Sequence, residues 1–421
     1  MTVDRSDYDV IVAGGGSAGV AAAVASARMG ARTLLVERYN CLGGAATMRN
    51  VVTYCGLYTL GETPRRVVGG IAEEVMQGLR KQGAVDGPHR HRGVYVTFEP
   101  EAVKPILDDL AAAAGVTVMF SSFVAAAERC DDRMRTVTVA GHSGLSAFAA
   151  KAFVDCTGEG DLAAFAGAST RYGNGADVNL GTLGTRFGGV PHAVPVTAER
   201  IAEAVADFGS RAEVLTKDRS VVARLPISGD VVVYLASEDY DPRDSLSMAA
   251  AEARGRRQAW GYLEVLRTIE GCEGVYLVAT GPEFGTRESR HLNCQRQFTW
   301  ADIENRARFD DCIALGGWGA EWHERATYES TYDYPPDRGA YEIPLGCLRS
   351  VDTANLFCAG RLADGDRKAG AAIRVMGTAF ATGQAAGIAA ALEAGGRFTV
   401  SAVQAALKKQ HAILDPAGIP A

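Results

Sequence analysis

The chain has 421 residues, of which 47% are hydrophobic and 22% are charged. This length is enough for two or more structural units, and the ordinary apolar content predicts a sizeable core. The 43 Lys and Arg against 50 Asp and Glu give a formal net charge of -7, which argues against a nucleic-acid or anionic-membrane partner.

The start of the chain and its nine cysteines bear on the cellular compartment. The first apolar strand begins within ten residues, with no basic segment and apolar run typical of a secretory signal. The cysteines are odd in number, scattered, and include no Cys-x-x-Cys pair, so we expect neither disulfides nor a zinc or other metal site. These features together predict a cytoplasmic protein.

A glycine-rich turn follows the first strand. The apolar run Tyr8–Ala13 leads into Gly-x-Gly-x-x-Gly, and an Ala-rich stretch, 20–29, reads as a helix. In such a turn the first glycine permits the tight bend, the second lets the backbone approach a pyrophosphate, and the third lets helix and strand pack closely. The residues concerned are Gly14, Gly15, Gly16, Ser17, Ala18 and Gly19. The N-terminus of the helix supplies N–H groups to the phosphates.

An acidic residue follows the second strand, at the position where such sites bind the ribose. The second strand, 33–36, ends at Glu37, about 20 positions beyond the glycines, where an acid accepts hydrogen bonds from a ribose 2′-OH. Its negative charge favours a free 2′-OH over a 2′-phosphate. A tight turn without a ligand is the alternative, but the strand, turn, helix, strand and acid in this order favour a dinucleotide site.

The later elements suggest a second unit inserted into the first. We expect a helix at 99–114, strands at 115–120, 122–125, 136–139 and 152–155, a second glycine-rich turn at 156–161, strand-like runs within 221–236, a long helix at 244–270, and strands at 275–279 and 355–359. The uncharged segment 375–392 reaches the length of a membrane span, but its Gly and Ala content favours a buried helix.

Several motifs in fixed order resemble one known family. Besides the opening turn they are Leu42-Gly-Gly44, Asp155-Cys-Thr-Gly-Glu-Gly-Asp161, Gly285-Thr-Arg-Glu-Ser-Arg290, Asn355-Leu-Phe-Cys-Ala-Gly-Arg361 and Ile373-Arg-Val-Met376. Over nearly its whole length the sequence resembles the FAD-dependent oxidoreductases of the glutathione-reductase-like fold, whose relatives include fumarate reductase and thiazole synthase flavoproteins. The resemblance implies an α/β protein with a Rossmann-like FAD-binding domain, 1–172 and 340–421, and an inserted α+β substrate domain, 173–339. Parts of 46–105 are compatible with either domain.

The resemblance also implies FAD as cofactor and assigns residues to it. Beyond the turn and Glu37, these are Arg38 over the adenine, Gly43, Gly44 and Ala45 near the pyrophosphate and flavin, Val124 at the adenine, the loop residues Thr157, Gly158 and Asp161, Gly360 and Arg361 at the ribityl chain, and Ala371, Ala372 and Ile373 at the start of a helix aimed at the flavin. A helix dipole there would stabilise negative charge on reduced flavin. For each residue outside the opening turn, simple packing of the fold is the alternative.

Four residues of the inserted unit are candidates for catalysis. His323 matches a histidine of similar family members, and imidazole is suited to taking the proton that accompanies hydride loss. Arg287, Arg290 and His291 follow a strand end; an arginine there could clamp a carboxylate or stabilise an enolate. A structural histidine, and salt bridges to Glu283 or Glu288, are the alternatives.

Two further features bear on the substrate and on the attachment of FAD. Arg367 and Lys368 stand where many relatives carry a histidine-containing stretch, which suggests an anionic or otherwise different substrate. Cys41 precedes the Leu-Gly-Gly loop and could tether the flavin, but a buried, unreactive thiol is the default, so we expect non-covalent FAD.

The sequence therefore predicts an FAD-dependent dehydrogenase or oxidase acting on a small organic molecule. No second Gly-x-Gly-x-x-Gly follows a strand, so a dedicated NAD(P)H domain is not expected. A flavin-dependent reductase or monooxygenase, and a non-redox nucleotide- or lipid-binding protein that reuses the fold, are the alternatives. The sequence leaves open the electron acceptor and whether the chain forms a homo-oligomer.

Overall fold

A computed structural model describes residues 8–175, 177–209 and 214–419. Its main element is a seven-stranded sheet in the order β6-β2-β1-β9-β8-β7, with β20 paired to β9. The strands are β1 (Tyr8–Ala13), β2 (Thr33–Val36), β6 (Thr117–Met119), β7 (Phe123–Cys130), β8 (Arg133–Gly141), β9 (Gly144–Asp155) and β20 (Leu356–Cys358).

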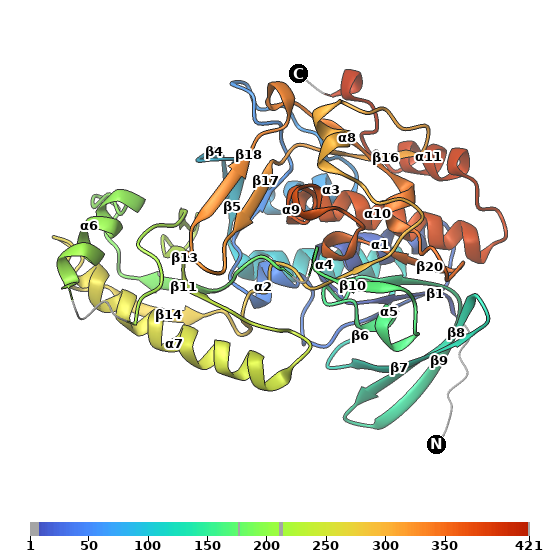
Figure 1. The fold of residues 1–421 in the computed structure, drawn as a ribbon, viewed down its shortest axis with the longest axis horizontal. Helices are drawn as coiled ribbons and strands as arrows, with labels where there is room; N and C mark the ends of the chain where they lie inside the picture. The colour runs from blue at the N-terminus through green and yellow to red at the C-terminus, as the bar shows by residue number, and fades with distance from the viewer. Residues whose placement is uncertain (1–7, 176, 210–213, 420–421) are drawn as a thin grey trace.

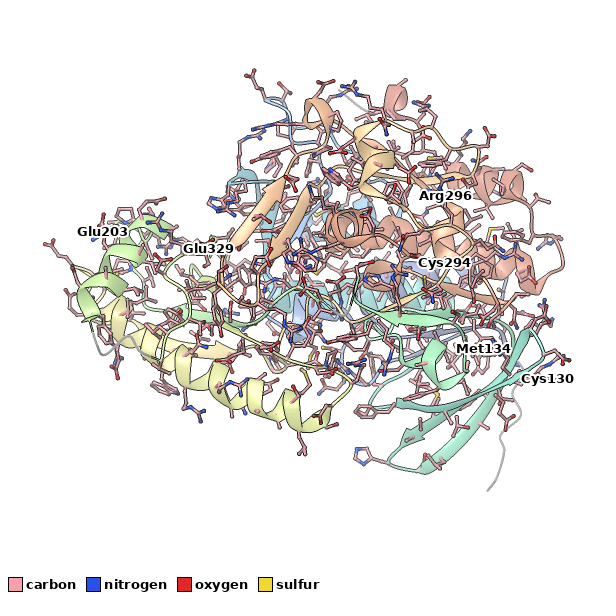
Figure 2. All side chains as sticks on the ribbon, viewed as in Figure 1. Cys130, Met134, Glu203, Cys294, Arg296 and Glu329 are labelled. Atoms are coloured by element: carbon pink, nitrogen blue, oxygen red, sulfur yellow. The ribbon has the colours of Figure 1, made fainter. Side chains whose placement is uncertain are left out.

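The centre of this sheet is parallel and buried. On β1, Val10 pairs with Thr33 of β2, and Ile11 pairs with Phe153 of β9, both in parallel register. The paired segments 10–13, 33–36 and 152–154 are almost entirely apolar and buried, as expected for strands covered on both faces. Beyond β9 the strands turn antiparallel and form a meander, in which Cys130, the last residue of β7, lies at the periphery of the molecule (Figure 2).

Helices from both ends of the chain pack together against this sheet (Figure 1). α1 (Ser17–Arg28) is alanine-rich and nearly all buried, and α10 (Met376–Ala394) crosses it closely. The remaining helices of this part are α2 (Ala45–Met48), α3 (Ile71–Lys81), α4 (Pro100–Ala114), α5 (Asp161–Phe165), α8 (Trp300–Glu304), α9 (Arg367–Ile373) and α11 (Val400–Lys409). The N- and C-terminal segments therefore share one core.

A second sheet, with its own core, lies to one side (Figure 1). It has the order β12-β13-β11-β14 and is entirely antiparallel. Its strands are β11 (Gly181–Gly188), β12 (Val222–Arg224), β13 (Val231–Glu238) and β14 (Tyr276–Thr280), and its helices are α6 (Ala198–Phe208) and α7 (Ser245–Arg267). Phe187, Tyr262 and Phe284 belong to the core of this unit.

The described residues form four further, smaller sheets. They consist of β3 (Thr53–Cys55), β5 (Val94–Phe98) and β4 (Val85–Arg90); β10 (Thr170–Tyr172) with β15 (Arg290–Leu292); β16 (Cys312–Gly316) with β19 (Tyr341–Pro344); and β17 (Ala320–His323) with β18 (Ser330–Asp333). Short 3-10 helices occur at Pro336–Arg338, Leu345–Leu348, Gly360–Leu362 and Pro416–Gly418. The division at 172/173 and 339/340 stays a prediction; β10–β15 and β16–β19 pair strands across those positions.

The late helix differs from the sequence expectation. The sequence places a helix from Ala371 onward, whereas the structure has α9 ending at Ile373 and α10 beginning at Met376. Val375 between them is extended, with ψ of 151°, and the two helix axes are bent by 90°. Among the described residues, no single helix meets the length and hydropathy of a membrane span; only α9 and α10 taken together do so.

Candidate functional site

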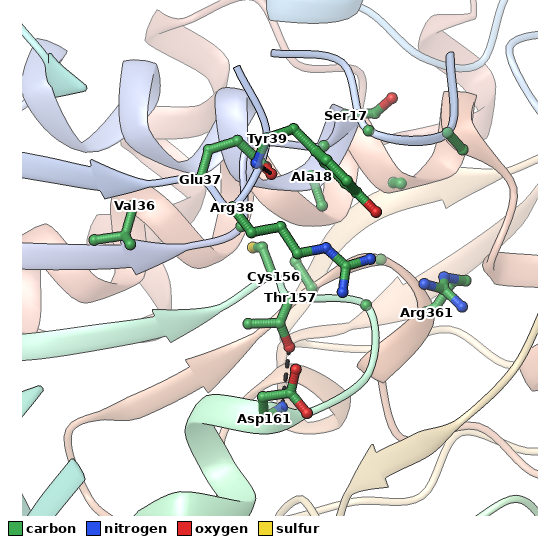
Figure 3. A pocket seen from close by; sticks show the side chains of 18 of the residues that line it. Ser17, Ala18, Val36, Glu37, Arg38, Tyr39, Cys156, Thr157, Asp161 and Arg361 are labelled. Carbon is green, nitrogen blue, oxygen red and sulfur yellow. Dashed lines mark hydrogen bonds between the residues drawn. The ribbon is translucent and has the colours of Figure 1, made fainter. Parts of the chain in front are cut away.

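A pocket lies where β1, β2, β9 and β20 end. Parallel strands bring their carboxyl ends to one edge, which is where open α/β sheets bind ligands. Figure 3 shows Val36 and Glu37 on one side of this pocket and Arg361 on the other, with Arg38, Thr157 and Asp161 between them. Of the expected cofactor residues, the pocket is lined by Gly14, Gly16, Ser17, Ala18, Glu37, Arg38, Gly44, Ala45, Val124, Thr157, Gly158, Asp161, Gly360 and Arg361.

The three glycines of the opening turn have distinct structural roles. Gly14 has a φ of +93°, and a Cβ built on it would lie 2.4 Å from the Cys156 carbonyl oxygen. A Cβ on Gly19 would lie 1.7 Å from the Gly14 carbonyl oxygen, so α1 packs on β1 only with glycine there. A Cβ on Gly16 would meet only Gly44 Cα, at 3.8 Å, so the backbone of Gly16 is open toward the pocket.

Two neighbouring glycines hold a loop against this turn. Gly43 donates its N–H to the Gly15 carbonyl at 2.9 Å, and it pairs with Gly16 in a parallel bridge. A Cβ on Gly44 would lie 2.8 Å from Gly16 Cα. Gly15, Gly19 and Gly43 therefore shape the turn without lining the pocket, while Gly44 reaches the pocket itself.

The first turn of α1 fits an anionic group. Its N-cap, Gly16, offers no side-chain oxygen to the free N–H groups. The Ser17 hydroxyl, on the pocket wall, is buried and has no hydrogen-bond partner among the described residues. Free backbone donors, a helix dipole and an orphaned hydroxyl together suit a pyrophosphate.

Glu37 is held at the end of β2 as a ribose-binding acid requires. It accepts hydrogen bonds from the backbone N–H groups of Gly15 and, at 2.9 Å, of Tyr39. Burial raises its pKa despite these bonds. Both carboxylate oxygens keep lone pairs for a further donor such as a ribose hydroxyl. Beside it, Val124 and Ser122 complete this part of the wall, and Ser122 N–H donates to the Glu37 carbonyl at 3.0 Å.

The second glycine-rich turn enters the pocket through Thr157. Its hydroxyl donates to Asp155 at 2.7 Å and accepts from the N–H groups of Gly160 and Asp161 at 2.9 and 3.1 Å, the latter drawn in Figure 3. Gly158 has a φ of +80°, and a Cβ there would lie 2.3 Å from the Arg361 guanidinium.

A chain of buried ion pairs connects the pocket to the second unit. Arg361 and Arg49 both contact Glu159, at 2.9 and 3.2 Å, and Glu283 pairs with Arg49 at 2.7 Å and with Arg38. Burial alone would raise the pKa of Glu159, but the charges of Arg361 and Arg49 lower it below its usual range. This network fixes the positions of the three arginines.

The residues expected at the flavin-facing helix start are not at a helix start. Ala371, Ala372 and Ile373 form the buried last turn of α9, outside the pocket lining. The helix that begins at the pocket is α10, where Met376 and, just before it, Arg374 contribute to the wall. The dipole argument therefore transfers to α10, because its N-terminus faces the pocket.

His323 lies on β17 and is not itself one of the residues that line the pocket. Its Nδ1 contacts the Ser330 hydroxyl at 2.8 Å, and its Nε2 lies 3.7 Å from Glu321. The pocket residue Arg374 donates to the carbonyl of Glu321, on the same strand, at 3.1 Å. Burial, followed by the charges of Arg287 and Lys217, holds the pKa of His323 well below its usual range, so the imidazole is neutral.

The other three catalytic candidates have different surroundings. Both ring nitrogens of His291 are engaged, by the Ala363 carbonyl at 3.0 Å and by Glu288 at 2.9 Å, as in a structural histidine. Arg290 is bound to Asp161 at 3.1 Å, so its charge is compensated. Arg287 instead donates to the Leu180 carbonyl and the Thr182 hydroxyl, at 2.5 and 2.6 Å.

Residues discussed for the substrate and for flavin attachment lie outside the pocket lining. Lys368 pairs with Asp333 at 2.9 Å, and Arg367 lies 3.9 Å over the Trp322 ring. The Cys41 thiol is nearly buried, near Thr47 and Met48, and burial raises its pKa. This environment is that of an unreactive thiol, so non-covalent FAD stays the prediction.

Sequence reasoning missed several pocket residues. These are Val36, Tyr39, Arg49, Ser122, Phe123, Cys156, Glu283, Ala359, Arg374, Met376 and Ala379. Tyr39, Ser122 and Phe123 directly neighbour predicted residues, which could have signalled them. Arg49 and Glu283 belong to no motif, and only the fold brings them together.

Comparisons with solved structures concern the fold alone. No curated protein matches the chain. Its fold is similar to that of BexE, from studies of oxidation during BE-7585A biosynthesis, to which it is 14% identical in sequence. The comparison covers 96% of this chain and 66% of BexE and gives a TM-score of 0.50. A geranylgeranyl bacteriochlorophyll reductase-like protein from Thermoplasma acidophilum has 13% identity, covers 97% of this chain and 85% of its own, and gives a TM-score of 0.48.

A family model settles the assignment. The model described as FAD dependent oxidoreductase matches residues 9–413, nearly the whole chain. The match includes the glycine turn, Glu37, the second glycine-rich loop and the Gly360–Arg361 segment that line the pocket. FAD is therefore the cofactor, the fold is a Rossmann-like FAD-binding α/β fold, and the chain belongs to the FAD-dependent oxidoreductase family.

Proposed function

We propose that the protein oxidises a small organic molecule at FAD, with His323 accepting the proton that the substrate releases. FAD supplies the hydride acceptor when bound. The observation that supports this proposal is a neutral, buried imidazole on β17, the strand to which the pocket residue Arg374 is hydrogen-bonded beside the start of α10. A dehydrogenation needs both a hydride acceptor and a proton acceptor, and His323 is suited to the second role.

The side-chain hydrogen bond of His323 is compatible with the tautomer that a proton acceptor at Nε2 requires. When Nδ1 carries the proton, it donates to the Ser330 hydroxyl at 2.8 Å, and Nε2 keeps the lone pair. Glu321, 3.7 Å from Nε2, is placed to stabilise the imidazolium formed after proton transfer. Ser330 and Glu321 are thus positioning residues on the β17–β18 pair.

Anaerobic flavin reduction tests this function. Purified holoenzyme is mixed without oxygen with 2-hydroxy acids, amino acids and primary alcohols, and the flavin absorbance is followed. We expect at least one substrate to bleach the flavin without NAD(P)H. His323→Ala should slow bleaching at saturating substrate by a factor of about 10² to 10⁴ while FAD content is kept.

A control variant and the pH dependence of kcat/KM test whether the effect is specific to His323. His142 is exposed in the β8–β9 hairpin, so His142→Ala should bleach at the wild-type rate. Because the pKa of His323 is below its usual range, kcat/KM should not fall as pH decreases through about 6.5. Bleaching by NADH or NADPH alone would instead favour the reductase or monooxygenase alternative.

A further inference from the structure

Three basic side chains gather around His323. Lys217 comes from the segment between α6 and β12, Arg287 from the loop after β14, and Arg374 from the α9–α10 junction. Arg287 donates to the Leu180 carbonyl, Leu180 donates its N–H to the His323 carbonyl at 3.0 Å, and Arg374 donates to the Glu321 carbonyl on the same strand. The positive charges of all three act on His323, as does that of the exposed Arg92, and Lys217 and Arg374 each interact with Arg287. We refer to Lys217, Arg287 and Arg374 as the basic cluster.

Within the described part of the chain, none of the three cluster residues has a carboxylate partner. Arg374 donates to a main-chain carbonyl, and Arg287 donates to a carbonyl and a hydroxyl. Lys217 has no side-chain hydrogen bond or ion pair there. Glu321 is the acid whose charge opposes them, and it lies beyond ion-pair distance of all three. By contrast, the other arginines of the pocket, Arg38, Arg49 and Arg361, are all paired with glutamates.

Burial and mutual repulsion disfavour the charged forms of the cluster residues in the folded chain. Burial and the charge of Arg287 lower the pKa of Lys217 to about 7, and burial and Arg374 lower that of Arg287 to about 10. The Nε atom of Arg374 is buried and has no partner among the described residues. Partly buried cations without counter-charge, and an unpartnered donor beside them, point to an anion that the protein receives from solution.

We propose that Lys217, Arg287 and Arg374 bind a carboxylate group of the substrate, next to His323 and the α10 end of the FAD pocket. Two guanidinium groups and an ammonium match the several lone pairs of a carboxylate, and charge-assisted hydrogen bonds are the stronger ones. The substrate class is therefore a small carboxylic acid bearing the bond that is oxidised, which rests on the oxidation proposed above.

Carboxylate binding would also prepare His323 for its role. A negative charge placed in the basic cluster opposes the cations that now disfavour imidazolium. The proton affinity of His323 would rise only when the substrate is bound. The same group would thus select the substrate and strengthen the base.

Calorimetric titration with acetate tests the site without requiring turnover. Acetate carries the carboxylate and cannot reduce flavin, and acetamide is its neutral counterpart. We expect the holoenzyme to bind acetate and not acetamide. Lys217→Met should weaken acetate binding by about tenfold or more, because a charge-assisted hydrogen bond is lost. Lys81→Met, at the exposed end of α3, should leave it unchanged.

The melting temperature of Lys217→Met distinguishes a role of Lys217 in anion binding from a role in holding the fold together. Because the pKa of Lys217 is lower in the folded chain than in the unfolded one, its charge costs stability below about pH 10 and fully below about pH 7. Lys217→Met should therefore melt no lower than wild type at pH 7, with a gain that shrinks toward pH 10. Arg374→Gln, with FAD content checked, is the second variant and should also weaken acetate binding.

The outcomes are distinct from those of the function test. Absence of acetate binding by wild-type holoenzyme, or equal binding by wild type and both variants, would overturn the site. Flavin bleaching by a substrate without acetate binding would leave the oxidation intact and remove the anion site. Acetate binding that the variants weaken supports the site even if no substrate bleaches the flavin.

Discussion

Gly16 is the residue whose missing side chain keeps the pocket open next to the helix N-terminus. A Cβ there has only Gly44 Cα nearby, at 3.8 Å, so the protein itself tolerates a methyl group. The branches of a valine would extend into the space for the pyrophosphate of FAD. We expect Gly16→Val to fold and to lose most bound FAD, measured as flavin absorbance per protein after gel filtration.

Two other glycines serve as comparisons for this variant. Gly61 has no atom within 4 Å of a built Cβ, so Gly61→Ala should retain FAD. Gly19→Ala would place its Cβ 1.7 Å from a backbone oxygen and should damage the fold itself. A Gly16→Val protein with a full complement of FAD would refute the placement of the pyrophosphate.

At the scale of elements, the crossing of α1 and α10 depends on small residues. A Cβ on Gly383 would lie 2.1 Å from the Ala18 carbonyl oxygen, and one on Gly387 would lie 2.0 Å from that of Ala22. These contacts are to backbone, so they cannot be relieved by a side-chain rotation. Because Ala18 lines the pocket, the spacing of the two helices also sets the pocket wall.

Gly383→Ala should therefore destabilise the protein although alanine favours helix. The gain in helix propensity is at most about 1 kcal/mol, whereas overpacking costs about 1–3 kcal/mol or more. Urea unfolding of the holoenzyme measures the difference. Gly395→Ala, at the end of α10, would place its Cβ 3.2 Å from the flexible Arg397 side chain and at an ordinary 3.5 Å from the Ala391 carbonyl oxygen, so it should change stability little. Equal stability of Gly383→Ala and wild type would contradict the close crossing.

The elements that the sequence predicted well are those with an uninterrupted local signal. β1 and β20 are apolar runs, and α4 and α7 have clear helical patterns, so each agrees within a few residues, whereas β9 begins at Gly144, eight residues before the predicted strand at 152–155. The break between α9 and α10 has no such signal, because neither Arg374 nor Val375 is a helix-breaking residue. There, tertiary contacts such as that of Arg374 with Glu321 accompany a bend that propensity does not indicate.

At the scale of the whole molecule, the predictable part of the site is the part contained in continuous segments. Gly14, Glu37 and Gly158 were found because each belongs to a local motif at a strand end. Lys217 was not found, since it lies in no motif and comes near Arg287 and His323 only after folding. Charge compensation is a property of the folded chain, so no spacing in the sequence distinguishes an ion-paired arginine from an unpaired one.

FAD itself should act as a stabilising ligand across the whole molecule. The pocket wall includes residues from the nucleotide fold, from α10 and, through Glu283, from the second unit, so unfolding destroys the site. A ligand that binds only the folded state stabilises it by about 2.7 kcal/mol at a concentration 100 times its Kd. We expect FAD-stripped protein to melt lower than holoenzyme, and its melting temperature to rise with the logarithm of added FAD. Gly16→Val should show no such rise, and FMN, which lacks the adenosine half that Glu37 is placed to bind, should give a much smaller one. A melting temperature independent of FAD in the wild-type protein would contradict the assignment of this pocket.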